Sequence, residues 1–162
     1  MSHSLGRLRV ALVSAAVLCV TVCANARAQE SAGAYRDIQS TLGTVPTFLK
    51  LFPEEGVAGA WAEFKSVQLN PQIALSGKEK ELIGLAVAAQ IPCSYCIYFH
   101  TAAAKANGAT DAEVREAVAM AAITRHWSTV LNGMQADPAT FRNETDTVLR
   151  LAAEHAKTTA AK

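Results

Sequence analysis

Four residues with reactive side chains, Glu81, Cys93, Cys96 and His100, follow one another at the spacing Glu-x11-Cys-x2-Cys-x3-His. No other part of the 162-residue chain gathers so many groups that can exchange protons or electrons. Two cysteines separated by two residues at a helix start can close into a disulfide. The positive end of the helix also favours the thiolate form, which reacts with peroxides and disulfides. The motif therefore indicates thiol redox chemistry.

The four side chains predict a division of roles. Cys96 would be the attacking thiolate, and Cys93 the resolving thiol that closes the disulfide and expels the hydroxyl of the oxidised Cys96 as water. His100 lies four residues after Cys96, one turn away on the same face of a helix. Together with Glu81, it would relay the protons.

Blander interpretations of these residues stay open. Glu81, in a first helical turn, could simply favour the helix dipole. Cys93 and Cys96 could form a static disulfide, although so short a loop removes little entropy from the unfolded chain. The cluster could bind zinc, but zinc sites usually take a second ligand pair from a distant segment, and the sequence offers none. His126 and His155 stand alone at helical spacing and are interpreted as packing or surface residues.

Pro92 controls how the motif is positioned, because proline lacks a backbone donor and disfavours helical angles at the preceding residue. A helix opened by the capping-box pattern of residues 76–79 should therefore end near Gln90, and a second helix should begin at Pro92 or the next residue. If the two helices run antiparallel, Glu81 and His100 come level. They lie about 15 Å and 13 Å from the turn at a rise of 1.5 Å per residue.

The rest of the chain predicts helices and no convincing strand, so we expect an all-α fold. Capping boxes, helix-opening prolines and glycine stops give the boundaries. Helices are expected over residues 35–42, from Pro53 to about residue 69, from residue 110 to about residue 134, and from Pro138 onward.

Apolar periodicity predicts how these helices pack. Residues 82–89 are apolar nearly all round the helix, which favours a fully buried position. The helix after residue 110 has two apolar stripes and so needs two packing partners, one of which could be another subunit. In the last helix, Phe141, Val148 and Leu151 are expected to face inward.

The first 28 residues have the pattern of a cleavable export signal. Arg7 and Arg9 supply positive charge, residues 10–24 are apolar, and residues 26–28 fit a small-x-small cleavage site. The apolar run is about 15 residues long, against the roughly 20 that a spanning helix needs. We therefore expect no membrane span after cleavage, a periplasmic or secreted location, and a single domain over residues 29–162.

The charge of the mature chain argues against a nucleic-acid or anionic-membrane partner. The signal contains three arginines and no acidic residue, so acids slightly outnumber bases once it is removed. Export also places the cysteine pair in an oxidising compartment, where it would rest as a disulfide unless a reductant acts on it. Cysteine count alone does not separate a catalytic pair from a structural one.

On these residues the chain resembles the superfamily of alkylhydroperoxidase AhpD and carboxymuconolactone decarboxylase, whose peroxidase branch carries the Glu-x11-Cys-x2-Cys-x3-His signature. The resemblance implies an AhpD-like helical bundle in which a central antiparallel helix pair carries the cysteine motif, assembled as a homo-oligomer of three or six subunits. It implies a hydroperoxide substrate, with Cys96 as the peroxidatic cysteine, Cys93 as its resolving partner, and Glu81 and His100 as the proton relay. It implies no haem, flavin or metal cofactor.

Two departures from the family pattern bear on function. The peroxidase branch often has a second histidine just before the second cysteine, and Tyr95 stands there in this chain. The pKa of a tyrosine is far higher, which makes it a poor base at neutral pH and could weaken the peroxidase activity. Export would also separate the protein from the family's cytoplasmic lipoyl-bearing reductants.

The main hypothesis is an exported thiol-dependent peroxidase that is recycled by an unidentified thiol reductant. One alternative is a thiol-disulfide oxidoreductase of the cell envelope. Another is a non-catalytic binding module in which the disulfide is inert. Decarboxylase chemistry is the least favoured, because that branch does not depend on a cysteine pair, and a scaffold alone does not determine the reaction.

Overall fold

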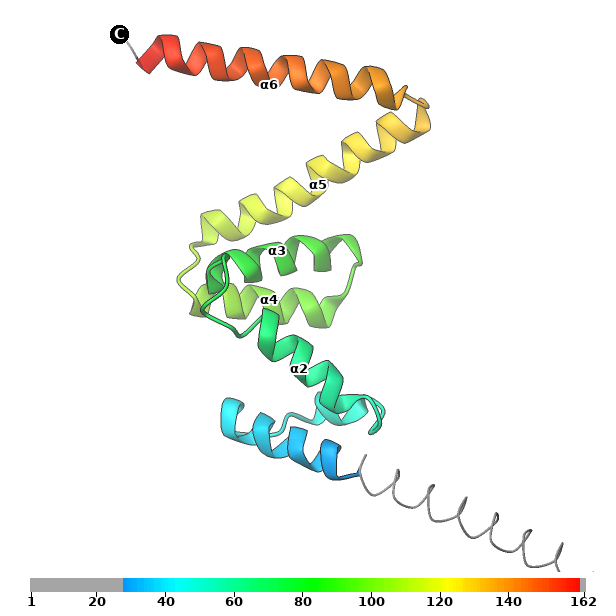
Figure 1. Cartoon of the computed structure of the whole chain (residues 1–162), viewed down its shortest axis with the longest axis vertical. Helices are drawn as coiled ribbons and strands as arrows, with labels where there is room; N and C mark the ends of the chain where they lie inside the picture. Colours follow the sequence, from blue (N-terminus) through cyan, green and yellow to red (C-terminus); the bar gives the residue numbers. More distant parts are fainter. Residues whose placement is uncertain (1–27, 161–162) are drawn as a thin grey trace, which may run out of the picture. The chain divides into compact units, whose positions relative to one another are not determined.

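The computed structural model describes residues 28–160, and every regular element in that range is a helix (Figure 1). The predicted all-α fold is therefore confirmed. Residues 1–27, which hold nearly all of the predicted export signal, lie outside the described residues, and the signal stays a prediction. Between residues 28 and 160, no helix has the length and apolar character needed to cross a membrane.

The chain divides after Leu75 into two compact units, and the single domain predicted for residues 29–162 stays a prediction. The elements of the first unit are a helix that includes residues 28–42, the short 3-10 helix η1 (Thr47–Leu51) and the helix α2 (Val57–Val67). Its core is made by four buried side chains of the first helix and α2: Ala34, Ile38, Val57 and Trp61.

Asp37 links the first helix of this unit to α2 through hydrogen bonds. Its carboxylate accepts hydrogen bonds from Trp61 Nε1 at 2.6 Å and from Lys65 Nζ at 2.8 and 2.9 Å. The bonds from Lys65 and Trp61 lower the pKa of Asp37 below its usual value. The same three residues help to line an open hollow whose walls include no cysteine or histidine. The Asp37 contacts therefore join the first helix of this unit to α2.

Two helix starts in the first unit differ from the prediction. The first helix already includes residue 28 rather than beginning at residue 35, although it ends before Gly43 as expected. The helix α2 begins at Val57 rather than at Pro53. The Pro53 carbonyl accepts the N–H groups of Gly56 at 3.0 Å and Val57 at 3.1 Å, which closes a turn ahead of the helix. Proline suits both a first helical position and the corner of a turn, and here it takes the turn.

The second unit carries the redox motif on its first two helices. Its elements are α3 (Gly77–Gln90), α4 (Ser94–Ala106), α5 (Asp111–Gly133) and α6 (Pro138–Ala160). The helices α3 and α4 run antiparallel beside each other, joined by the turn at Pro92, and α5 packs mainly on α3 (Figure 1). This confirms the predicted central helix pair and the end of α3 at Gln90, whereas α4 begins slightly later than predicted, with Cys93 as its N-cap.

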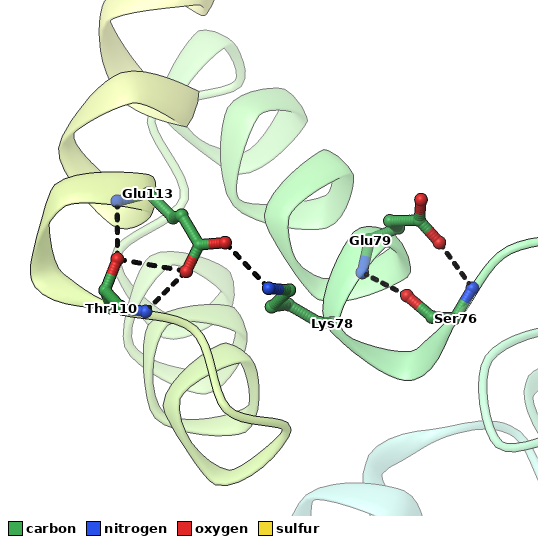
Figure 2. A network of polar contacts seen from close by, with 5 residues as sticks. All are labelled: Ser76, Lys78, Glu79, Thr110 and Glu113. Atoms are coloured by element: carbon green, nitrogen blue, oxygen red, sulfur yellow. Dashed lines mark hydrogen bonds and ion pairs between the residues drawn. The ribbon is translucent and has the colours of Figure 1, made fainter.

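Capping boxes determine where α3 and α5 begin (Figure 2). Ser76 Oγ accepts the N–H of Glu79, whose carboxylate accepts the N–H of Ser76, and Thr110 and Glu113 make the same reciprocal bonds. Lys78 Nζ then donates to Glu113 Oε1 at 2.7 Å, which joins the two helix starts. The bond from Lys78, together with those from Thr110, lowers the pKa of Glu113 from 4.5 to about 2. Both capping boxes confirm the sequence prediction.

A second polar contact joins the other end of α3 to α5. The Gln90 side chain donates to the carbonyl of Ala121 at 2.6 Å and accepts from Arg125 Nε at 2.7 Å. Beyond Gln90, the N–H of Cys93 donates to the carbonyl of Ala88 at 3.1 Å. Both ends of α3 are therefore held, and the turn that leads to the first cysteine is anchored on the α3 backbone.

The helix α3 is not buried on all sides, which corrects the expectation for residues 82–89. It buries Glu81, Leu85 and Ala88, whereas Ile83 and Val87 leave about half of their surface in solvent, at 51% and 52%. An apolar pattern shows that a face avoids water, but not which partner covers it.

The expected inward packing of the last helix is also wrong. Phe141, Val148 and Leu151 are exposed, and α6 contains no buried residue. In α5 only Ala121 is buried. Several large apolar side chains of α5 and its C-cap instead face solvent in the single chain: Val118, Met120, Ile123, Trp127, Val130 and, at the C-cap, Met134.

Candidate active site

The cysteine pair lies where α4 begins. Cys93 and Cys96 form a disulfide with Cα atoms 5.3 Å apart. Cys93 is the N-cap of α4, and its Sγ accepts a hydrogen bond from the backbone N–H of Cys96 at 3.2 Å. Both residues are half-buried. The free N–H groups and the positive dipole end of a helix stabilise negative charge on sulfur at this position.

Glu81 and His100 meet across the α3–α4 pair. The Nδ1 atom of His100 lies 2.7 Å from Oε2 of Glu81. The Glu81 side chain is 6% exposed and the His100 side chain 19% exposed, so water has little access to the contact. An ionised carboxylate only accepts hydrogen bonds, so beside an ionised Glu81 the hydrogen in this bond would lie on Nδ1. A neutral imidazole of that tautomer keeps the lone pair of Nε2, which can accept a proton.

The turn at Pro92 makes this meeting possible. Glu81 and His100 lie at nearly equal separations from the turn, on helices that run in opposite directions. The prediction that they come level is confirmed. Cys96 is one turn before His100 on α4, so the sulfur pair and the imidazole belong to one face of the same helix.

Gly84 is a member of the site that the sequence analysis missed. It lies one turn after Glu81 on α3, and a Cβ atom at this position would fall within 2.8 Å of His100 Nε2 and closer still to two other ring atoms. The imidazole therefore lies directly against the α3 backbone. The register places Gly84 on the same face of α3 as Glu81, but only the opposite helix shows which group occupies the space beside it.

Aromatic side chains surround the motif on α4. Phe99 meets the His100 ring edge-on, with ring centroids 5.3 Å apart. Tyr95, in the place of the second histidine of the family pattern, is 86% exposed, and Tyr98 is 79% exposed. The disulfide is therefore bordered by aromatic residues at the protein surface.

Two further histidines fall among residues 28–160, and both lie on other helices than the motif. His126 is on α5 and meets Trp127 edge-on, and His155 is exposed on α6. Across residues 28–160, no group of three or more histidine, cysteine, aspartate or glutamate side chains is arranged to hold a metal ion. The structure thus brings together Cys93 with Cys96, and Glu81 with His100, whereas the catalytic roles of these four residues stay predictions.

The comparisons with known proteins agree with this arrangement. A sequence model of the carboxymuconolactone decarboxylase family matches residues 55–137. The crystal structure of the alkylhydroperoxidase AhpD core from Rhodospirillum rubrum matches with a TM-score of 0.59 and 29% sequence identity, over 70% of this chain and 87% of that one. No functionally curated protein gives a significant sequence match. The chain has the AhpD-like helical fold and belongs to the carboxymuconolactone decarboxylase family.

Proposed function

We propose that the protein is a thiol-dependent peroxidase that reduces hydroperoxides through the Cys93–Cys96 pair. The observation that carries the proposal is the buried contact between Glu81 and His100, one helical turn from a disulfide at a helix start. A disulfide that only cross-links the chain does not require a buried acid–imidazole pair. Thiol chemistry does, because protons must move to and from the reacting groups.

The oxidative half-reaction starts from the dithiol. The Cys96 thiolate attacks one peroxide oxygen, the O–O bond breaks, and the alkoxide takes a proton and leaves as an alcohol. Cys96 is now a sulfenic acid. The Cys93 thiol attacks the Cys96 sulfur, the hydroxyl group leaves as water, and the disulfide forms. Two thiols are oxidised, and one hydroperoxide is reduced to an alcohol and water.

The reductive half-reaction needs an external thiol donor. A donor thiolate attacks Cys96 Sγ, and the S–S bond breaks to release the Cys93 thiolate. That leaving group is stabilised because Cys93 Sγ already accepts the Cys96 N–H at the positive end of α4. A second donor thiol completes the reduction, so that one donor disulfide forms for each peroxide reduced.

Glu81 and His100 would move protons in both half-reactions. With Nδ1 bound to Glu81, the imidazole presents Nε2 as a base for the attacking thiol and, once protonated, as an acid for the leaving oxygen. The carboxylate would stabilise the imidazolium that exists between these steps. No haem, flavin or metal takes part in this scheme.

We further propose that the protein is exported and acts as a homo-oligomer. The pattern of residues 1–28 supports cleavage and a periplasmic or secreted location. Exposed apolar side chains on α5 and α6 support assembly with further copies of the chain, and the family resemblance suggests trimers or hexamers. The slight acidic excess of the mature chain favours neither a nucleic-acid nor an anionic-membrane partner.

A pair of serine variants tests the assignment of the two sulfurs. Cys96→Ser should abolish turnover of cumene hydroperoxide, because the attacking atom is lost. Cys93→Ser should consume about one equivalent of peroxide and stop with Cys96 as a sulfenic acid, which dimedone traps. Full turnover in Cys96→Ser would show that another group attacks the peroxide.

Thiol titration tests whether the pair cycles at all. The reduced wild-type protein should lose two free thiols per molecule after a stoichiometric dose of cumene hydroperoxide, and a dithiol donor should restore them. Oxidation should be complete within seconds to minutes if the reaction is enzymatic. A thiol count unchanged by peroxide would contradict the peroxidase proposal.

A thiol-disulfide oxidoreductase is the second candidate. It is favoured by the exposed border of the disulfide, where Tyr95, Tyr98 and Ile91 leave most of their surface in solvent, as a protein substrate would require. Refolding of a scrambled disulfide substrate separates the two activities. Faster isomerisation of that substrate without measurable peroxide turnover would replace the peroxidase proposal with this one.

A further inference from the structure

The His100 ring occupies the space that a side chain at position 84 would fill. A Cβ atom built on Gly84 would lie within 2.8 Å of Nε2 and nearer still to Cε1 and Nδ1 of the ring. Real Cβ atoms essentially never approach another heavy atom within 3.0 Å. Any L-amino acid other than glycine at this position therefore requires the imidazole or the backbone to move.

The ring is not free to move without breaking a contact. The Nδ1 atom of His100 lies 2.7 Å from Oε2 of Glu81. The Phe99 ring meets the imidazole edge-on, with ring centroids 5.3 Å apart. Glu81 is itself buried, at 5% exposure, so it is poorly placed to follow a displaced ring. A methyl group at position 84 would therefore separate the imidazole from the carboxylate.

We propose that Gly84 is a positioning residue for the thiol chemistry. Its missing side chain creates the space in which the His100 imidazole lies against α3, with Nδ1 toward Glu81 and Nε2 left as the basic nitrogen. The catalytic part of this inference rests on the proposed peroxidase function. The positioning of the ring does not, and it can be tested separately.

Helix energetics supply a matched control. Glycine within a helix is less stable than alanine, so a helical Gly→Ala change normally raises stability wherever the methyl group has room. Gly59 in α2 is exposed, and a Cβ atom there would meet nothing within 4 Å. Gly59→Ala therefore reports the helix effect alone, and Gly84→Ala reports the helix effect plus the displaced ring.

Thermal unfolding of five purified proteins forms the first test: the wild type, Gly59→Ala, Gly84→Ala, His100→Ala and the Gly84→Ala/His100→Ala double variant. Gly59→Ala should raise Tm by roughly 2–5 °C. Gly84→Ala should give no rise, or a fall, in the wild-type background. In the His100→Ala background, where no ring is displaced, Gly84→Ala should raise Tm about as much as Gly59→Ala does. An equal rise in both backgrounds would overturn the proposal.

The tautomer of His100 provides a readout that a purely structural role would not change. Long-range ¹H–¹⁵N spectra of the wild type should show the hydrogen on Nδ1, and Gly84→Ala should shift this signal toward the Nε2–H tautomer common in free histidine. Gly59→Ala should leave it unchanged. The same Nδ1–H signal in wild type and Gly84→Ala would show that the ring keeps its place, and so would refute the positioning role.

Peroxide turnover then connects the geometry to catalysis. Gly84→Ala should lower kcat/KM by at least about tenfold, and should cost nothing further when His100 is already alanine. Gly59→Ala should keep wild-type turnover. If the wild type did not reduce peroxide, the proposed peroxidase function would be wrong. The Tm and tautomer measurements would still decide whether Gly84 positions the His100 ring. An active wild type with a fully active Gly84→Ala would end the catalytic role of Gly84 alone.

Discussion

Among residues 28–160, Glu81 is the one charged side chain that is buried. Removing a carboxylate from water is costly unless polar partners compensate, and replacing such a group by an apolar residue often stabilises a protein. A buried charge that contacts an imidazole, on the helix paired with the one that carries the cysteines, is therefore better explained by chemistry than by folding.

Glu81→Gln should lower peroxide kcat/KM by about 100-fold, because the amide keeps the shape of the side chain but cannot stabilise a protonated His100. Far-UV circular dichroism should show unchanged helix content. The matched control is Glu116→Gln, which removes an exposed glutamate from α5 and should leave turnover unchanged. Equal turnover in wild type and Glu81→Gln would contradict the proton relay.

The sequence predicted both contacts of the site, the Cys93–Cys96 disulfide and the Glu81–His100 pair, but not the role of Gly84. The spacing of Cys93 and Cys96 is short enough for a disulfide in any helix start, and the register around Pro92 brought Glu81 level with its partner. Gly84 escaped because a single glycine in an apolar helix has no local signature. Its role is visible only when the opposite helix is placed against it.

At the scale of elements, the strongest sequence signals were the local ones. The capping boxes at Ser76 and Thr110 were predictable because their bonds lie within four residues. The start of α2 was not, because Pro53 fits both a helix and a turn, and the choice depends on how the first unit packs. The link from Lys78 to Glu113 spans 35 residues and leaves no pattern in the sequence.

The Glu113 contacts predict a loss of stability in acid. The pKa of Glu113 is about 2 in the folded protein, below its usual 4.5, so the carboxylate stabilises the fold above pH 4.5. That contribution should be lost as the pH falls from about 4.5 to about 2. Melting curves of wild type and Glu113→Gln should differ at pH 6, with the variant less stable, and should converge toward pH 2.

Glu116→Gln again serves as the control for this measurement, because Glu116 is exposed on the same helix. Its melting temperature should follow the wild type throughout the acid range. A constant gap between wild type and Glu113→Gln from pH 6 to pH 2 would show that the charge on Glu113 does not contribute.

At the scale of the whole molecule, the exposed apolar surface of α5 and α6 is the feature that the sequence could not resolve. Periodicity showed that Phe141, Val148 and Leu151 share a face, but it could not show that these side chains stay exposed among residues 28–160. An inward face and an intersubunit face have the same pattern. The second apolar stripe of α5 could likewise face either the same chain or another subunit.

Single acidic substitutions on this surface should reduce the size of the assembly. Met120→Glu on α5 and Val148→Glu on α6 place a charge where an interface would exclude water, and both side chains are exposed in the single chain. Sedimentation velocity should show smaller species than the wild-type trimer or hexamer, with helix content unchanged. Thr147→Glu adds the same charge beside Val148 at an exposed polar position and should have less effect. A monomeric wild type would contradict the assembly proposal.

The last helix has a practical consequence for handling the protein. Since α6 buries no side chain within its own chain, little free energy opposes its local unfolding, and proteases cut backbone that opens in this way. Trypsin should therefore cut first at Arg142, Arg150 or Lys157 when the protein is dilute, and more slowly at concentrations where a neighbouring copy shields the helix. Cleavage rate against concentration would thus measure subunit affinity without any assay of activity.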